Sequence, residues 1–337
     1  MTMLIMTDQG LYCPAGNFFI DPSRAVENAV ITHAHSDHAR RGSRKYFTVD
    51  KGVSLLKARI GQNITVQSFK YGEAFFINQV KISFHSAGHI LGSSQVRLEH
   101  EGLVWVASGD YKREPDPTCA PFEIVKCDVF VTEATFGAPS FKWPKEKNLG
   151  AEIYEWWCAN AELGMNSVLF AYSLGKAQRV LGVLHPYASR PVYCHPSVTT
   201  LNECYRDEGV ALADTFCLSQ LHPQKKLQGE LFLVPQSFLK TDQARVIGDH
   251  YQTAFASGWM APGSSGYGRG NFDHGFVMSD HADWNDLVQT VQETGAKKIY
   301  VQHRGKGALV RHLKNLGLQA FPDSDLFPKN PSQLMLF

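Results

Sequence analysis

The side chains with the clearest potential for chemistry lie close together near the N-terminus. Within six residues, His33, His35, Asp37 and His38 supply four potential metal ligands. Two histidines separated by one residue at the end of a strand can direct their imidazoles to one metal ion, while the Asp and His that follow turn toward a second ion. The alternative is a polar surface turn with incidental histidines, but four ligands in so short a stretch favour a metal site.

Two such ions need more ligands than this turn supplies, and two later residues are candidates. His89 lies in the stretch 86–93 (SAGHILGS), and Asp110 lies in 108–111 (SGDY). Each follows an apolar segment and has a glycine beside it, which allows close approach of the backbone. Asp110 suits a bridging position because its carboxylate has two oxygens, and each of them can bind one of the two ions. Either residue alone is more typical of an ordinary loop.

Short apolar segments that favour β-structure must position these side chains. Five such segments end directly before, or shortly before, a residue that can bind metal or transfer a proton. The segments are 26–32, 80–84, 104–107, 129–132 and 298–302, and the residues are His33, His89, Asp110, Glu133 and His303. This pattern predicts a layered α/β fold that gathers its chemistry at one edge of a sheet.

The middle of the chain has a different character. A connector rich in proline and lysine spans 139–148, and helices are predicted over 151–161 and 176–184. Strands are predicted over 167–172, 191–194 and 231–234, and few candidate ligands occur there. We therefore expect a domain at 149–275 inserted into another domain, formed by residues 1–148 and 276–337.

Composition restricts the class of protein. The chain has 337 residues, a net charge of +1, 44% hydrophobic and 19% charged residues, which fits two folded domains and excludes a mainly disordered protein. Apolar stretches are only strand-length and the N-terminus lacks a secretory signal, so we expect a cytoplasmic protein without a membrane segment. Seven cysteines without a CxxC pair argue against a disulfide framework and against a thiolate zinc site.

These motifs together resemble a known superfamily. The series HAHSDH (33–38), GHILGS (88–93) and SGD (108–110) resembles that of the metallo-β-lactamases, and Asp21 matches an early aspartate that supports the ligands there. Glu133, His281 and His303 resemble motifs A, B and C of the β-CASP subgroup, which acts on nucleic acids. The stretches 10–16, 108–118 and 255–260 are most similar to bacterial DNA-ligase-associated DNA exonucleases, which are described as mRNA 3′-end processing factor-like.

The resemblance implies a four-layer αββα metallo-β-lactamase fold with an inserted β-CASP α/β domain. It also implies two divalent metal ions, Zn²⁺ or Mn²⁺, that share Asp110. The implied ligands of one ion are His33, His35, His89 and Asp110, and those of the other are Asp37, His38, Asp110 and His303.

The implied activity is that of a dinuclear metal-dependent phosphodiesterase. In the implied reaction, metal-activated hydroxide attacks phosphorus. Asp37 and Asp110 are implied catalytic residues because they hold the ions, and His281 is the general acid that Glu133 orients. A 5′ single-stranded DNA exonuclease in DNA repair is predicted, with a DNA ligase or a helicase of a repair operon as possible partners. The alternatives are a ribonuclease of the RNA 3′-end-processing type and a protein that binds nucleic acid or a repair partner without cutting.

The sequence also offers candidate contacts for substrate phosphates. These are Lys176 and Arg179 at a predicted helix start, Arg40 after the metal turn, and Ser93. A basic run over 40–59 accompanies Arg40, and ordinary solvated surface charge is the alternative explanation for all of these cations.

Two positions depart from the β-CASP pattern. Arg304 follows His303 where the subgroup commonly has glycine, and Ala134 follows Glu133 where a hydroxyl residue is usual. In the eukaryotic branches a histidine at the place of His303 accompanies RNA substrates, which points away from DNA.

Overall fold

The protein is described by a computed structural model that covers residues 2–145, 147–222, 225–262, 271–303 and 305–328. It divides into two compact units. Unit 1 comprises Met1–Pro139 and His281–Phe337, and unit 2 comprises Ser140–Asp280. The sequence-based proposal put the corresponding boundaries after residues 148 and 275.

Unit 1 contains two sheets. The first has the order β1 (Ile5–Thr7), β2 (Gly10–Cys13), β3 (Phe18–Ile20), β4 (Asn28–Val30), β5 (Lys45–Val49) and β6 (Val66–Phe69). The second has the order β19 (Gln319–Pro322), β18 (Lys298–Val301), β11 (Val129–Thr132), β10 (Leu103–Ala107), β9 (Ser94–His100), β8 (Val80–Ser86) and β7 (Ala74–Ile77).

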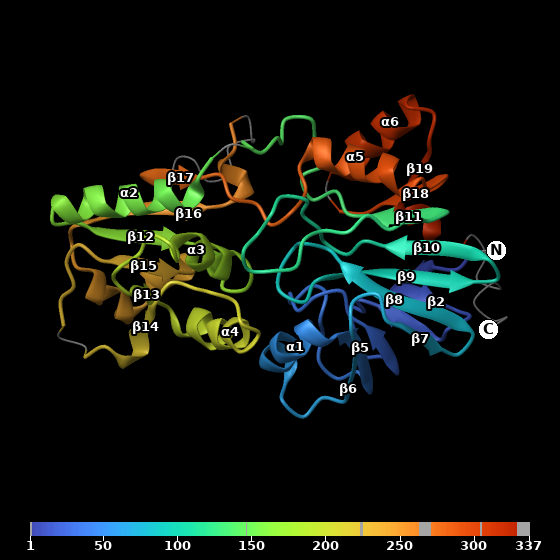
Figure 1. The fold of residues 1–337 in the computed structure, drawn as a ribbon, viewed down its shortest axis with the longest axis horizontal. Helices are drawn as coiled ribbons and strands as arrows, with labels where there is room; N and C mark the ends of the chain where they lie inside the picture. Colours follow the sequence, from blue (N-terminus) through green and yellow to red (C-terminus); the bar gives the residue numbers. More distant parts are fainter. Residues whose placement is uncertain (1, 146, 223–224, 263–270, 304, 329–337) are drawn as a thin grey trace. The chain divides into compact units, whose positions relative to one another are not determined.

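The two sheets pack face to face and helices cover their outer faces. Apolar side chains of both sheets, such as Phe47 and Phe84, share one buried core. Outside the second sheet lie α5 (Trp284–Thr294) and α6 (Lys306–Asn315), and outside the first lies α1 (Val53–Ile60). Figure 1 shows these helices on opposite sides of the sandwich. The predicted αββα fold is therefore confirmed.

The direction of the strands explains how distant motifs meet. The strand β8 pairs antiparallel with β9, which pairs antiparallel with β10, so β8 and β10 run the same way. The strands β10, β11 and β18 are mutually parallel. The carboxyl ends of β8, β10, β11 and β18 therefore meet at one edge, as the sequence pattern predicts.

Unit 2 is built on one parallel sheet. Its order is β14 (Thr215–Cys217), β13 (Val192–Cys194), β15 (Leu231–Val234), β12 (Asn166–Phe170), β16 (Tyr251–Ala256) and β17 (His274–Phe276). Among the described residues of this unit, the α-helices are α2 (Leu149–Glu162), α3 (Lys176–Leu184) and α4 (Pro196–Asp207). The side chain of Asn148 accepts a hydrogen bond from the Ala151 N–H and so caps α2 where the predicted connector ends.

The other helical segments in the described part of the chain are short 3₁₀ helices of three to six residues. They are η1 (Asp50–Gly52), η2 (Leu218–Gln220), η3 (Gln236–Lys240), η4 (Asp242–Ile247), η5 (Gly258–Met260) and η6 (Asp323–Leu326). Within the described ranges, no helix combines the length and the apolar character that a membrane crossing needs.

Candidate metal centre and active site

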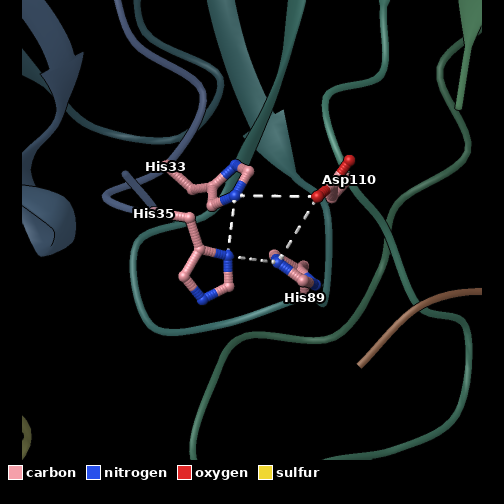
Figure 2. Close-up of side chains that lie close together, drawn as sticks. All are labelled: His33, His35, His89 and Asp110. Atoms are coloured by element: carbon pink, nitrogen blue, oxygen red, sulfur yellow. Dashed lines mark hydrogen bonds and ion pairs between the residues drawn. The ribbon is translucent and has the colours of Figure 1, made fainter. Parts of the chain in front are cut away.

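Three histidines and one aspartate converge at the common strand edge. Potential ligand atoms of His33, His35, His89 and Asp110 all lie within 4.8 Å of one another. The Nδ1 atom of His35 lies 3.0 Å from His33 Nε2 and 3.1 Å from His89 Nε2. Figure 2 shows the three rings and the Asp110 carboxylate turned toward a common point. Several ring nitrogens that face one another at this distance form a suitable cage for a metal ion.

Asp110 lies at the centre of a larger constellation. Its Oδ2 atom is 3.8 Å from His33 Nε2 and 3.4 Å from His38 Nε2, and its Oδ1 atom is 3.5 Å from His303 Nε2. Burial disfavours the charged form, but His38, His281 and His303 outweigh it and hold the pKa of the carboxyl well below its ordinary value. Among the described residues, the buried Oδ1 atom has no hydrogen-bond partner. An ionised carboxylate with an unused buried oxygen fits a bridging metal ligand.

Hydrogen bonds behind the rings determine which nitrogens face the centre. Thr32 donates its N–H and its O–H to the Asp21 carboxylate, at 2.8 and 2.6 Å. The Thr32 oxygen is then the acceptor for His33 Nδ1 at 3.0 Å, and Asp21 also accepts from His38 Nδ1 at 2.7 Å. Both histidines therefore carry their proton on Nδ1, which leaves the Nε2 lone pairs free to bind metal. Asp21 thus lies where the family resemblance implied.

The protonation states of the two rings differ without a metal. Burial and the neighbouring imidazoles hold the pKa of His33 well below its ordinary value, so this ring is neutral. Burial also acts against protonation of His38, but Asp110 and Asp21 outweigh it and raise the pKa of that ring well above its ordinary value. A centre that attracts a proton onto His38 is one where a cation is stabilised, and a metal ion can replace that proton.

The Asp21→Asn variant tests the supporting role of this carboxylate. We expect the affinity for metal to fall about 10–100-fold, because His38 loses its charged acceptor and the Thr32 hydroxyl that orients His33 loses the carboxylate that fixes it. Competition with a metallochromic chelator measures the change. Asp8→Asn, at an exposed aspartate, is the matched control. An unchanged affinity in Asp21→Asn would contradict the role.

Glycines beside the ligands permit the close approach that the sequence predicts. Gly88 has φ +68°, and a Cβ atom there would lie 2.3 Å from the Lys112 carbonyl oxygen. Gly109 has φ +55°, and a Cβ atom there would lie 2.8 Å from the Thr32 Cβ. Neither position therefore admits a side chain without displacing the loop that carries a ligand.

Ser93 is part of the loop that carries His89. Its hydroxyl oxygen accepts hydrogen bonds from the backbone N–H groups of His89 and Ile90, at 3.0 and 3.2 Å, and the residue is only 1% exposed. A side chain so buried and so occupied shapes the His89 loop. The contact of Ser93 with a substrate phosphate stays a prediction, which this arrangement does not support.

The candidate second metal site is more open. Asp37 is exposed, and its Oδ2 atom lies 3.8 Å from His38 Nε2. His303 adopts the left-handed conformation with φ +67°, and its side chain is 37% exposed. Burial lowers the pKa of this ring, but Asp110 outweighs it and raises the pKa above the ordinary value. These residues can complete a site around the second oxygen of Asp110.

Backbone contacts hold the turn that carries His303. The Gln302 N–H donates to the Thr132 carbonyl and the Gly305 N–H donates to the Ala134 carbonyl, both at 2.8 Å. A Cβ atom on Gly305 would lie 2.4 Å from the Ala134 oxygen, so the chain needs glycine at that position. Ala134 thus supports the turn through its carbonyl group, for which a side-chain hydroxyl is not needed. Arg304 lies outside the described residues.

His281 and Glu133 form a pair next to Asp110. The Nδ1 atom of His281 lies 3.0 and 3.2 Å from the two Glu133 oxygens and 3.9 Å from Asp110 Oδ2. Glu133 is buried and accepts from the Tyr111 N–H at 2.6 Å. Because Nδ1 faces the carboxylate, Nε2 is the nitrogen that remains for proton transfer.

Tyr111 is a positioning residue that the sequence did not reveal. Its N–H donates to Glu133, and its carbonyl accepts from the Ala282 N–H at 2.7 Å. Tyr111 therefore holds the Glu133 carboxylate and also the loop that carries His281, the partner of Glu133. Any residue type has these backbone groups, so only the geometry can identify this contact.

The cations predicted to bind phosphate in unit 2 are buried against a carboxylate. The Nζ atom of Lys176 lies 2.8 Å from Asp280 Oδ2, and the Arg179 guanidinium donates to the Ser279 carbonyl and lies 3.7 Å from Asp280 Oδ1. Lys176 is 3% and Arg179 5% exposed. The phosphate contacts of Lys176 and Arg179 stay predictions, and their burial against Asp280 favours a structural role for both charges. Arg40 is exposed beside the metal turn and stays a proposed phosphate contact.

Replacing Lys176 tests this structural role. Lys176→Met leaves the buried Asp280 carboxylate with less compensation, and we expect unfolding of unit 2 to cost about 3 kcal/mol less. Urea denaturation measures the change, with Lys240→Met at an exposed lysine as control. A variant of unchanged stability but weakened nucleic-acid binding would favour the phosphate interpretation.

Comparisons with known proteins identify nucleases and a DNA ligase as relatives. No protein-family model matches the sequence. A "Probable DNA ligase" of Opitutus terrae is 27% identical over 93% of this chain, and an "RNase J-like protein" of Methanocaldococcus jannaschii is 26% identical over 54% of it. An "RNase aCSPSF2" of Saccharolobus solfataricus is 34% identical over 50% of the chain. The chain spans 30%, 49% and 40% of these three proteins, respectively.

A solved structure shares the fold. A crystal structure of a protein of unknown function from Enterococcus faecalis V583 superposes with a TM-score of 0.53 at 14% identity. The match covers 83% of this chain and 76% of the other. At this identity the likeness concerns the fold alone.

Proposed function

We propose that this chain is a metal-dependent nuclease of the β-CASP group of the metallo-β-lactamase superfamily, with single-stranded DNA as its substrate. The observation that carries the proposal is the buried, ionised Asp110. One of its oxygens faces His33 and the other faces His303, and a fixed imidazole–carboxylate pair stands beside it.

The donor set fits divalent metal ions. Imidazole and carboxylate ligands suit Zn²⁺ and Mn²⁺ alike, so we propose one of these as the native metal. His33, His35, His89 and Asp110 would hold one ion, and Asp37, His38, Asp110 and His303 the other. Divalent ions bound here would supply a nucleophilic water at neutral pH and neutralise the charge of the phosphodiester.

The chain's own residues supply orientation and the proton. Asp21 and Thr32 keep the Nε2 atoms of His33 and His38 directed at the centre. Glu133 binds His281 through Nδ1 and stabilises its protonated form, so that Nε2 can donate a proton to the leaving sugar oxygen. Arg40, exposed after the metal turn, is the proposed contact for a substrate phosphate.

The relatives support both DNA and RNA as substrate class. One relative, which aligns with 93% of this chain, is named a probable DNA ligase, and the matching segment is 30% of that protein. This name supports a DNA substrate and a DNA ligase as a partner, and we propose in addition a role in DNA repair with a helicase as the alternative partner. Ribonuclease names among the other relatives, together with a histidine at position 303, favour RNA as the second candidate.

Cleavage of 5′-labelled single strands tests the proposal. We expect DNA to be shortened progressively from its 5′ end with added Mn²⁺ or Zn²⁺, and EDTA to abolish the reaction. Matched RNA of the same sequence is the second arm. Faster RNA cleavage would favour the ribonuclease, internal products would overturn the exonuclease, and tight binding without cleavage of either strand would indicate a non-cutting protein.

A further inference from the structure

Two cysteine thiols lie next to each other in unit 2, outside the residues that form the metal centre. Cys194 ends β13 and Cys217 ends β14, and the two are register partners on adjacent parallel strands. Both are free thiols. Neighbouring strands lie about 4.7–4.9 Å apart, which is within the Cα separation of about 4.4–6.8 Å that a disulfide requires.

The two thiols lie on the same face of the sheet. Tyr193 and Phe216, the register partners one residue earlier, have ring centroids 5.6 Å apart and so share one face. Successive side chains of a strand alternate, which puts Cys194 and Cys217 together on the opposite face. There the Thr199 hydroxyl of α4 lies 3.3 Å from the Cys217 sulfur and 3.1 Å from the Pro196 carbonyl oxygen, so that the two acceptors share its proton.

The environments of the two thiols suit different steps of one oxidation. Cys217 is partly exposed on an edge strand, and the hydroxyls of Thr199 and Ser219 lie 3.3 and 3.1 Å from its sulfur. Burial raises the pKa of this thiol, but these hydrogen bonds outweigh it and lower the pKa below the ordinary value. Cys194 is fully buried, which raises its pKa strongly. Reactive cysteines that are partly exposed and have a neighbouring thiol are typical of redox-sensitive pairs.

We propose that Cys194 and Cys217 are a modification site, a thiol pair that peroxide oxidises to a disulfide. The Cys217 thiolate attacks hydrogen peroxide, the O–O bond breaks, and hydroxide leaves, which gives a sulfenic acid on Cys217. The Cys194 sulfur then attacks this sulfur, the S–O bond breaks, and the hydroxyl leaves as water with the Cys194 proton. The two thiols lose two electrons and two protons in total, and peroxide becomes two waters. The strand β14 that carries Cys217 is only three residues long and lies at the edge of the sheet.

Peroxide treatment of the full chain tests the proposal. Because no lysine or arginine lies between Cys194 and Cys204, trypsin leaves both in one peptide, so the mapping uses the Cys204→Ala background. We expect a linked peptide pair that joins Cys194 to Cys217 and that dithiothreitol separates. Cys217→Ser removes the link, whereas Cys194→Ala lets Cys217 proceed to the sulfinic acid.

A labelling experiment checks which thiol reacts first. Cys217 should react with iodoacetamide severalfold faster than Cys158, which is also partly exposed. Thr199→Val should slow the labelling of Cys217 and leave Cys158 unchanged. Labelling of Cys217 at the rate of Cys158, or peroxide products in which Cys217 is oxidised without a link to Cys194, would overturn the proposal.

Discussion

Asp110→Ala is expected to lose bound metal and nuclease activity together. The carboxylate lies within 4 Å of His33, His38 and His303, so its removal leaves facing imidazoles without the anion that both proposed ions share. Metal assistance is worth several kcal/mol of transition-state stabilisation. Because each 1.36 kcal/mol corresponds to a factor of ten, the rate should fall at least about a thousandfold. Elemental analysis of metal per chain and cleavage of a labelled single strand measure the two effects.

A graded comparison separates a bridging carboxylate from an ordinary ligand. Asp37→Ala should weaken only the second site, since Asp37 is exposed and approaches His38 alone among the described ligands. Asp249→Ala, at an exposed aspartate, is the control and should keep both metal and activity. An Asp110→Ala protein that retains its full metal content would contradict the bridging role.

The sequence predicts which side chains meet at the sheet edge, because their placement follows from strand periodicity. An apolar strand that ends in a polar residue delivers that residue to the sheet edge whatever the details of packing. His89, Asp110, Glu133 and His303 are delivered in this way by β8, β10, β11 and β18. Their convergence requires only that these four strands run in one direction.

Residues outside this pattern are harder to predict, for physical reasons. Ser93, Lys176 and Arg179 have the chemistry of phosphate contacts, but their orientation depends on tertiary partners that the sequence does not disclose. For the two cations that partner is Asp280, about a hundred residues away. A lysine on a helix has the same local signature whether it faces solvent or a buried carboxylate.

His281→Ala is expected to retain metal and to slow cleavage of single-stranded DNA by roughly a hundredfold or more, the contribution typical of a general acid. The prediction rests on the ring's own contacts. Its Nδ1 atom is engaged by Glu133, and the side chain is 20% exposed, so Nε2 can reach a substrate oxygen. Metal content and single-turnover cleavage rates are measured on the same preparation. Glu133→Gln should slow cleavage less, because the imidazole remains while its anionic partner is lost.

The leaving group distinguishes proton donation from a structural role. A sugar oxygen needs a proton as it departs, whereas p-nitrophenolate departs without one. With a p-nitrophenyl phosphodiester, therefore, the His281→Ala defect should largely disappear if His281 acts only as the acid. An equal defect on both substrates with metal retained would identify a positioning role. Loss of metal would instead assign His281 to the cluster with Asp110 and Glu133, whose ligand atoms lie within 4.8 Å of one another.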